Sequence, residues 1–271
     1  MNKKLFLFDL DGTLLTDEKK VSSKTMAALQ RYTEAGNVFA ICTGRAVENA
    51  LEVQKKLGLA FPGSYVVGYN GGEIYDYSAG KSIYRTGVPL EIVEPILDLA
   101  ADMGIHCQTY NQKYIICRNY NENLTFYRRY LRTSVIITDN VMEELAVDPG
   151  KMIAIEIHDR PKIEAFRDEM VRRYGDQLSI MFSNPWYLEI ISKEASKGNA
   201  LVKLAEYLGI PVRDTYAAGD EENDISMILA AGCGIAMKNG NPAVRAAADI
   251  VTDKDNNEDG LVPLLEQAAR T

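Results

Sequence analysis

The sequence predicts an α/β fold with a doubly wound parallel sheet and an inserted α+β domain. Three observations support this prediction. Short, nearly continuous apolar runs occur toward both ends of the chain, helix-like segments alternate with them, and the middle of the chain contains strands that partly alternate apolar and polar residues. We therefore expect residues 1–83 and 196–271 to form one discontinuous core domain, and residues 84–195 to form an inserted α+β domain.

The apolar runs are typical of strands that are buried on both faces of a parallel sheet. They occupy residues 4–10, 38–43, 65–70, 215–219 and 233–237. Helix-like segments follow them, and most end just before a glycine. We predict these helices at residues 24–35, 46–57, 197–208, 224–231 and 242–248, the last opening with Pro242.

The middle of the chain predicts a sheet with one face exposed to solvent. Residues 151–158 and 187–192 alternate apolar and polar side chains in part. Further strands are expected in a pair over 105–117, joined at Asn111-Gln112, and at 178–183, which Asn184-Pro185 joins to the strand at 187–192. Helices are expected at 90–103, near 121–131 and at 161–174.

Composition excludes some classes of function. The chain of 271 residues has 30 Lys and Arg against 38 Asp and Glu, a formal net charge of 30 − 38 = −8, which argues against a nucleic-acid partner. No apolar stretch approaches the roughly 20 residues of a membrane span, and acids interrupt the apolar run at the N-terminus too early for a secretory signal. We expect a cytoplasmic protein without a nucleic-acid or membrane partner. For oligomeric state, a monomer or weak homo-oligomer is the default.

The first candidate site is an acid pair, Asp9 and Asp11, at the end of the first predicted strand. The carboxyl edge of an open α/β sheet is where ligands bind, and alternate residues of an extended segment point the same way. Gly12 would let the chain turn there. Carboxylates so close together favour a hard cation such as Mg²⁺. The alternative, a turn with two solvated acids, suits an isolated pair better than one that follows a buried strand.

A second acidic cluster follows the strand at 215–219 and contains Asp220 and Asp224. It is expected at the same sheet edge, where both acids could face a cation. Capping of the next helix is an equally simple interpretation of this cluster alone. Its pairing with Asp9 and Asp11 favours a shared metal site.

Two further features suggest a seat for a phosphate. Thr43-Gly44-Arg45 links the second strand to a helix, where a hydroxyl and free backbone N–H groups can bind an anion, although a threonine-capped turn explains it as well. Lys197 opens a helix, an unfavourable place for a cation in the helix dipole. Most such lysines are solvated surface residues, but this one suggests a nearby anion.

Together, and in this order, these pieces resemble the haloacid dehalogenase (HAD) superfamily. Its motifs are DxDG[TV], a Thr or Ser after a hydrophobic strand, a lysine, and an acidic GDx₃D. The large insertion resembles the cap of the Cof-type phosphatase branch, which also shows TGR, NGG-like, KG and GDxxND sequences. The matching residues here are Asp9 to Thr13, Thr43 to Arg45, Asn70 to Gly72, Lys197-Gly198 and Gly219 to Asp224.

The resemblance implies a role for each matching residue. Asp9 would be the nucleophile that accepts the phosphoryl group, and Asp11 the general acid and then the general base. Mg²⁺ would be held by the Asp9 carboxylate, the Asp11 backbone carbonyl and Asp220, with Asp224 as a further or outer ligand. The phosphoryl oxygens would be held by Thr43, Lys197, Asn223 and the backbone N–H groups of Leu10 and Gly44.

The implied function is a Mg²⁺-dependent phosphatase that hydrolyses small phosphomonoesters, such as sugar phosphates, through an aspartyl-phosphate. A phosphomutase or phosphotransferase would use the same intermediate. A receiver domain, which is phosphorylated without turnover, is the alternative from another class. An acid two residues after the nucleophile argues against it, since that acid would shorten the life of the phospho-form.

Overall fold

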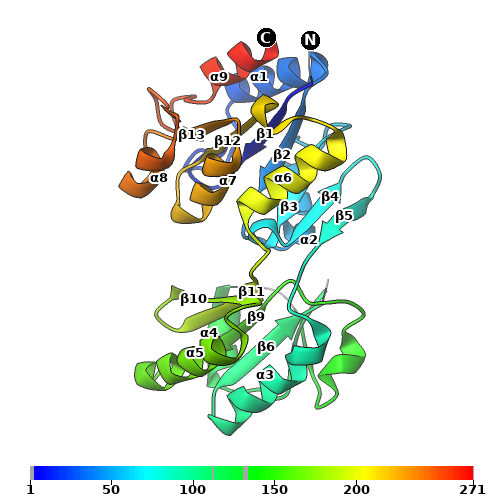
Figure 1. Cartoon of the computed structure of the whole chain (residues 1–271), viewed down its shortest axis with the longest axis vertical. Coiled ribbons are helices and arrows are strands. Elements are labelled where there is room, and N and C mark those ends of the chain that lie inside the picture. The colour runs from blue at the N-terminus through cyan, green and yellow to red at the C-terminus, as the bar shows by residue number, and fades with distance from the viewer. Residues whose placement is uncertain (1–2, 112, 131–133, 271) are drawn as a thin grey trace. The chain divides into compact units, whose positions relative to one another are not determined.

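The computed structural model describes residues 3–111, 113–130 and 134–270. The chain divides into two compact units. The first runs to Arg85 and resumes at Ala195, and the second is Thr86–Glu194 (Figure 1). The limits expected from the sequence for the inserted segment were 84 and 195.

The first unit is built on an eight-stranded sheet in the order β14-β13-β12-β1-β2-β3-β4-β5. The strands from β14 to β3 run parallel, and β4 and β5 are antiparallel. The strands are β1 (Leu5–Phe8), β2 (Val38–Cys42), β3 (Tyr65–Gly68), β4 (Glu73–Asp76), β5 (Lys81–Arg85), β12 (Thr215–Gly219), β13 (Cys233–Ala236) and β14 (Ile250–Val251).

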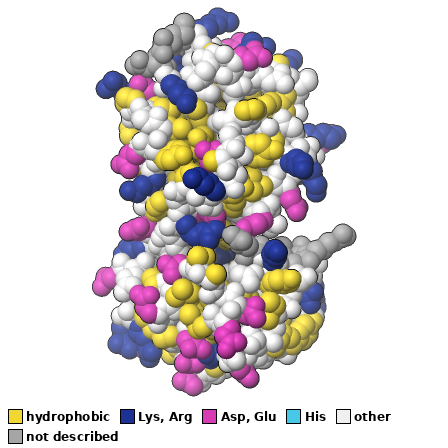
Figure 2. All heavy atoms as spheres, turned by 90° about the vertical axis from the view of Figure 1, so that its right-hand side faces the viewer, with side chains coloured by type: hydrophobic (Ala, Val, Ile, Leu, Met, Phe, Trp, Pro, Cys, Tyr) yellow, Lys and Arg dark blue, Asp and Glu magenta, His cyan; other side chains and the backbone are white. Residues whose placement is uncertain are grey.

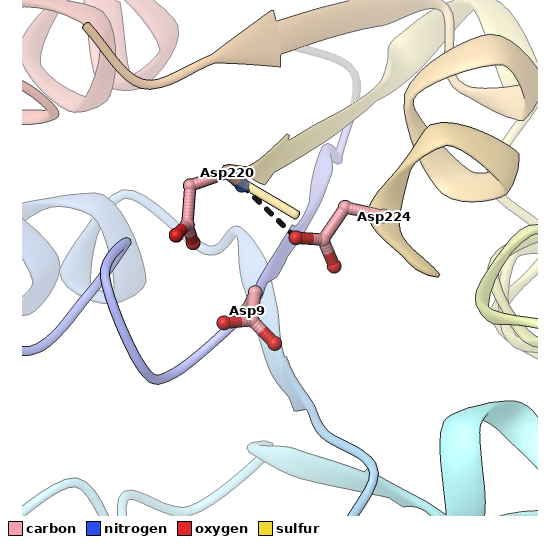
Figure 3. A group of neighbouring side chains, drawn as sticks. All are labelled: Asp9, Asp220 and Asp224. Atoms are coloured by element: carbon pink, nitrogen blue, oxygen red, sulfur yellow. Dashed lines mark hydrogen bonds between the residues drawn. The ribbon is translucent and has the colours of Figure 1, made fainter. Parts of the chain in front are cut away.

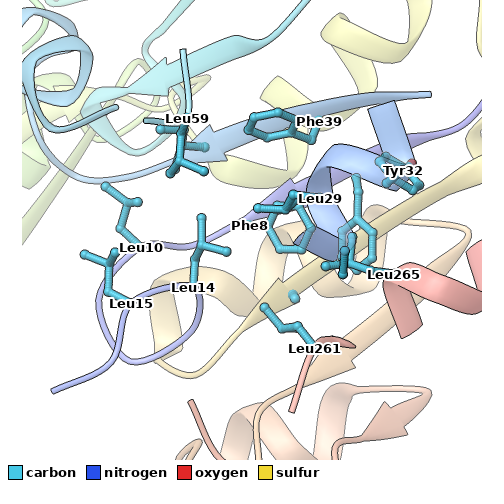
Figure 4. Packing of buried hydrophobic residues seen from close by; sticks show 14 of the residues in the cluster. Phe8, Leu10, Leu14, Leu15, Leu29, Tyr32, Phe39, Leu59, Leu261 and Leu265 are labelled. Atoms are coloured by element: carbon cyan, nitrogen blue, oxygen red, sulfur yellow. The ribbon is translucent and has the colours of Figure 1, made fainter. Parts of the chain in front are cut away.

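Helices cover both faces of this sheet because β1 is fully buried and directs apolar side chains to each side. Phe6 and Phe8 pack with α1 (Ser23–Glu34), α2 (Val47–Lys56) and α9 (Val262–Arg270). Figure 4 shows Phe8 with Leu29 and Tyr32 of α1 and Leu265 of α9. Leu5 and Leu7 pack with α6 (Lys197–Leu208) and α7 (Ile225–Ala230) on the other face. The short helix α8 (Pro242–Ala247) packs against β13. The predicted doubly wound α/β fold is thus confirmed.

The hairpin of β4 and β5 was not predicted, and its antiparallel strands make the sheet mixed. Its sequence contains too many polar residues to predict a buried pair of strands. Two of its acids are nevertheless buried, since Glu73 is 4% and Asp76 is 7% exposed. Arg85 donates to Glu73 at 2.6 Å and the Ala79 N–H donates to Asp76 at 2.9 Å. Buried acids with such partners are tolerated in a strand, which hydrophobic patterning cannot reveal.

The second unit has a six-stranded sheet in the order β10-β11-β9-β6-β7-β8, antiparallel except for β7 and β8. The helices α3 (Leu90–Asp102) and α5 (Arg160–Tyr174) cover one face, and α4 (Glu122–Tyr127) lies on the other. The strands are β6 (His106–Tyr110), β7 (Tyr114–Cys117), β8 (Ser134–Ile137), β9 (Met152–Ile155), β10 (Leu178–Asn184) and β11 (Tyr187–Ser192).

Two predictions for this unit fall partly on residues outside the described ranges. The helix expected near 121–131 is α4 followed by a 3₁₀ turn, Arg128–Tyr130, and Leu131 lies outside the described residues. Gln112, expected in the turn between β6 and β7, also lies outside them. Strand β8 was not predicted.

Acidic and basic side chains are interspersed over the face drawn in Figure 2. Within the part of the chain that the structure describes, no helix has both the length and the apolar character needed to span a membrane.

Candidate active site

The predicted site residues of the first unit come from loops at the carboxyl edge of the parallel sheet. Strand β1 pairs with β12 on one side and with β2 on the other. Asp9 follows β1, Asp220 follows β12 and Thr43 follows β2. Parallel pairing therefore brings together residues that lie more than 200 positions apart in the sequence, at the edge where α/β proteins bind ligands.

Three carboxylates form the centre of the site. Asp9, Asp220 and Asp224 each offer an oxygen, and these oxygens lie within 4.8 Å of one another (Figure 3). The three residues are 9%, 7% and 0% exposed. Oδ2 of Asp224 accepts hydrogen bonds from the backbone N–H groups of Asp220 at 2.9 Å and Glu221 at 3.0 Å, so Asp224 also fixes the loop that carries Asp220. A group of this kind could hold a metal ion.

Lys197 lies beside these acids and is completely buried. Its Nζ donates to Oδ1 of Asp9 and to Oδ1 of Asp224, each at 2.5 Å. The residue opens α6, and Ser196 caps that helix by accepting from the N–H of Asn199 at 3.1 Å. If all are ionised, three carboxylates and one ammonium group leave a net charge of 1 − 3 = −2.

Burial raises the pKa of two acids at this centre, Asp9 and Asp220. The pKa of Asp9 rises to about 7 because burial outweighs the attraction of Lys197, and the pKa of Asp220 rises to about 6, again chiefly through burial. Burial acts to lower the pKa of Lys197, but Asp9 and its other neighbours raise it above the usual range. The buried carboxylates thus lack positive charge, and a divalent cation would supply it.

The side chain of Asp11 does not lie with the three carboxylates. The prediction that the carboxylates of Asp9 and Asp11 share one site is therefore wrong for the Asp11 side chain. Strand β1 ends at Phe8 and the chain turns, so the alternation of an extended strand does not reach Asp11. The Asp11 carboxylate is 40% exposed and is bound by Lys19 at 2.7 Å and Arg45 at 2.8 Å. Burial acts to raise its pKa, but the hydrogen bonds from both cations lower it overall.

Gly12 and Thr13 position Asp220 from the first loop. Thr13 donates to Oδ1 of Asp220 at 2.7 Å. Gly12 has a φ of +86°, and a Cβ at this residue would lie 2.3 Å from Oδ2 of Asp220. Thr13 is the final residue of the DxDGT motif, and no separate role was predicted for it.

The residues expected to hold phosphate lie in neighbouring loops. Thr43 is 4% exposed, and its Oγ1 accepts from the N–H of Arg45 at 3.3 Å. Asn223 is exposed and donates to Oδ1 of Asn70 at 3.1 Å. A Cβ at Gly44 would lie 3.1 Å from the same oxygen. Asn70, to which the sequence analysis gave no role, therefore contacts two of the predicted phosphate ligands.

The backbone of Leu10, another predicted phosphate ligand, follows Asp9 directly, and its side chain is fully buried in the core. This packing holds the turn after β1 against the sheet (Figure 4).

Comparison with known proteins finds relatives that match almost the whole chain. The phosphatase YitU of Bacillus subtilis, named for 5-amino-6-(5-phospho-D-ribitylamino)uracil, is 30% identical over 271 residues, 97% of this chain and 96% of its own. A pyridoxal phosphate phosphatase of Escherichia coli is 28% identical over 275 residues, 98% of each chain. A solved haloacid dehalogenase-like hydrolase from Bacteroides thetaiotaomicron superposes with a TM-score of 0.83 at 27% identity, over 98% of this chain and 99% of its own.

The model of the haloacid dehalogenase-like hydrolase family matches residues 6–265, a span that contains every residue of the site described above. The chain therefore belongs to the haloacid dehalogenase-like hydrolase family, and it is an enzyme.

Proposed function

We propose that the protein is a Mg²⁺-dependent phosphatase that hydrolyses small phosphomonoesters, such as sugar phosphates, through an aspartyl-phosphate. The observation that carries this proposal is the buried group of Asp9, Asp220 and Asp224, with Lys197 bonded to Asp9 and Asp224. Two relatives that are named as phosphatases support it, and this chain matches 96% and 98% of their length.

The residues present fit a magnesium ion. Asp9, Asp220 and Asp224 offer carboxylate oxygens, the ligands that this hard cation prefers. The net charge of −2 in the ionised group matches a divalent cation. A bound ion would neutralise the carboxylates and withdraw charge from the phosphoryl oxygens. The backbone carbonyl of Asp11 is the further ligand that the family pattern implies.

Asp9 performs the covalent step in this proposal. One carboxylate oxygen attacks phosphorus, the bond from phosphorus to the leaving oxygen breaks, and an aspartyl-phosphate forms. Lys197 holds the Asp9 carboxylate in place by its bond to Oδ1 at 2.5 Å. Thr43, Lys197, Asn223 and the N–H groups of Leu10 and Gly44 bind the oxygens of the transferred group.

Asp11 moves the protons. It donates one to the leaving oxygen, then removes one from the water that attacks the aspartyl-phosphate, so that phosphate is released and Asp9 is regenerated. Lys19 and Arg45 favour its ionised form, which accepts the proton in the second step and must be protonated again before it can act in the first.

The test is a phosphate-release screen over a panel of phosphorylated metabolites and p-nitrophenyl phosphate, with Mg²⁺ and with EDTA. We expect release that depends on Mg²⁺, and we expect Asp9→Asn to abolish it while the circular dichroism spectrum is unchanged. Undiminished activity of Asp9→Asn would rule out this mechanism. Isomerised sugar phosphate without free phosphate would instead identify a mutase.

A further inference from the structure

The loop after β3 contains three consecutive residues in the left-handed region of backbone conformation. Tyr69, Asn70 and Gly71 have φ values of 51°, 54° and 104°. Residues with a Cβ seldom adopt such values, and neighbouring residues that do so persist only where the surrounding structure holds them. Strained segments of this kind concentrate at functional sites.

The backbone of the loop is bound to the Thr43-Gly44-Arg45 turn. The N–H of Tyr69 donates to the carbonyl oxygen of Arg45 at 2.8 Å, and the N–H of Asn70 donates to the carbonyl oxygen of Thr43 at 3.0 Å. The left-handed backbone therefore aims two successive N–H groups at the turn that carries Thr43 and Gly44.

The side chain of Asn70 links that turn to the loop after β12. Its Oδ1 accepts from Nδ2 of Asn223 at 3.1 Å. A Cβ at Gly44 would lie 3.1 Å from Oδ1 and 3.3 Å from Nδ2 of Asn70, so the amide group lies directly against the Gly44 backbone. Gly44 and Asn223 are both expected to bind phosphoryl oxygens, and Asn70 touches both.

Gly71 connects the same loop to the lysine helix. A Cβ at this residue would lie 2.1 Å from the carbonyl oxygen of Ser196 and 3.0 Å from the backbone nitrogen of Lys197. The loop consequently contacts the three segments that carry Gly44, Asn223 and Lys197, none of which is adjacent to another in the sequence.

We propose that Asn70 is a positioning residue for phosphoryl transfer, which holds the Gly44 turn and the Asn223 side chain at a fixed separation. This inference rests on the proposed function. Phosphoryl transfer depends on fixed placement of the groups around the transferred phosphate. The rate should therefore fall if the Gly44 N–H and the Asn223 side chain are poorly positioned, even when the nucleophile is intact.

The decisive variant is Asn70→Gly, because glycine adopts the left-handed backbone without strain and removes the side chain that carries the amide. We expect kcat/KM for a phosphomonoester to fall at least about 10-fold, mainly through kcat, and the melting temperature to stay within about 2 °C of the wild type. A residue that only stabilised the fold would lose activity and melting temperature together. Asn257→Gly is the control for loss of an asparagine side chain in a loop, since Asn257 is exposed and accepts from the N–H of Asp17 at 3.0 Å.

A double-mutant cycle with Asn223→Ala tests whether Asn70 acts through Asn223. We expect the double variant to lose little more activity than the worse single variant. The inference would be overturned, while the proposed function stands, if the two single losses in kcat/KM multiply in the double variant. It would also be overturned if kcat/KM of Asn70→Gly lies within twofold of the wild type.

If Asn70→Gly does not fold, Asn70→Asp is the variant to measure. It tolerates the same backbone, and its charge beside the phosphate seat should reduce kcat/KM, so full activity in it would overturn the inference. A wild-type protein that releases no phosphate would refute the proposed function itself, and this inference with it.

Discussion

At the scale of single residues, the charged side chains of the site differ in burial and in their partners. Lys197 is uncharacteristic of lysine, since it is fully buried and bonded to Asp9 and Asp224. Removing one partner of a buried ion pair leaves a charge without compensation and is strongly destabilising. Asp11, in contrast, is held by cations at a half-exposed position, where its carboxylate can exchange protons with solvent.

Lys19 is the residue on which the orientation of Asp11 can be tested. Lys19→Met removes one of two cations on that carboxylate, and we expect kcat for an alkyl phosphate to fall about 3- to 10-fold. The loss should be smaller for p-nitrophenyl phosphate, because nitrophenolate leaves without a proton. Steady-state phosphate release with the two substrates measures this difference.

The neighbouring Lys20 provides the control for that experiment. Its Nζ binds Glu18 at 2.8 Å, and both side chains are exposed, so Lys20→Met should match the wild type. An equal loss with both substrates in Lys19→Met would show that the lysine does not act through protonation of the leaving oxygen by Asp11.

At the scale of elements, local signals set the helix limits well where a cap and a stop are both present. Helix α6 begins and ends at the predicted residues, with Ser196 as its N-cap and Gly209, at a φ of 67°, directly after it. The β4–β5 hairpin was missed because its strands contain charged residues where a buried strand is expected to be apolar. Arg85 of β5 binds Glu73, and the Ala79 N–H in the connecting turn binds Asp76. Propensity and periodicity do not show that these acids have partners across the hairpin.

In the second unit, Glu156 ties the segment after β9 to α5. Its Oε2 binds Nζ of Lys162 at 2.9 Å, and its Oε1 accepts from the N–H of His158 at 3.0 Å. Burial acts to raise the pKa of Glu156, but these hydrogen bonds outweigh it and lower the pKa below the usual 4.5. A lowered carboxyl pKa stabilises the fold above pH about 4.5, and that stabilisation is lost as the pH falls through the folded-state pKa.

Glu156→Gln should therefore reduce the free energy of unfolding by about 1 kcal/mol at pH 7, with a smaller difference at pH 4 and below. Urea unfolding followed by the fluorescence of Trp186 measures it, because Trp186 is the single tryptophan and lies in this unit. Glu164→Gln, which breaks an exposed pair with Arg160, is the control. A difference that stays constant from pH 7 to pH 3 would contradict the assigned ion pair.

At the scale of the whole molecule, the net charge of −8 conceals an uneven distribution. Basic and acidic side chains are interspersed on the face drawn in Figure 2, whereas three acids converge on one buried point of the first unit. Such a point repels a phosphate dianion and destabilises the fold unless a cation is bound.

Magnesium should therefore raise the melting temperature as well as the activity. A ligand that binds only the folded state stabilises it by about 2.7 kcal/mol at 100 times its Kd, which corresponds to a shift of several degrees for a unit of this size. Differential scanning calorimetry with about 10 mM Mg²⁺ and with EDTA measures the shift. Asp220→Asn should reduce it, and an identical shift in that variant would place the cation elsewhere.

The sequence by itself determined the doubly wound core, most element limits and the acids, threonine and lysine of the family pattern, because buried strands, caps and short motifs are local signals. Only the tertiary structure decided that Lys197 bridges Asp9 and Asp224, that Asp11 turns away to Lys19 and Arg45, and that Asn70 lies between Gly44 and Asn223. Most of these contacts join residues far apart in the chain. Burial, pairing and backbone strain at such places depend on the packed surroundings, which no local pattern encodes.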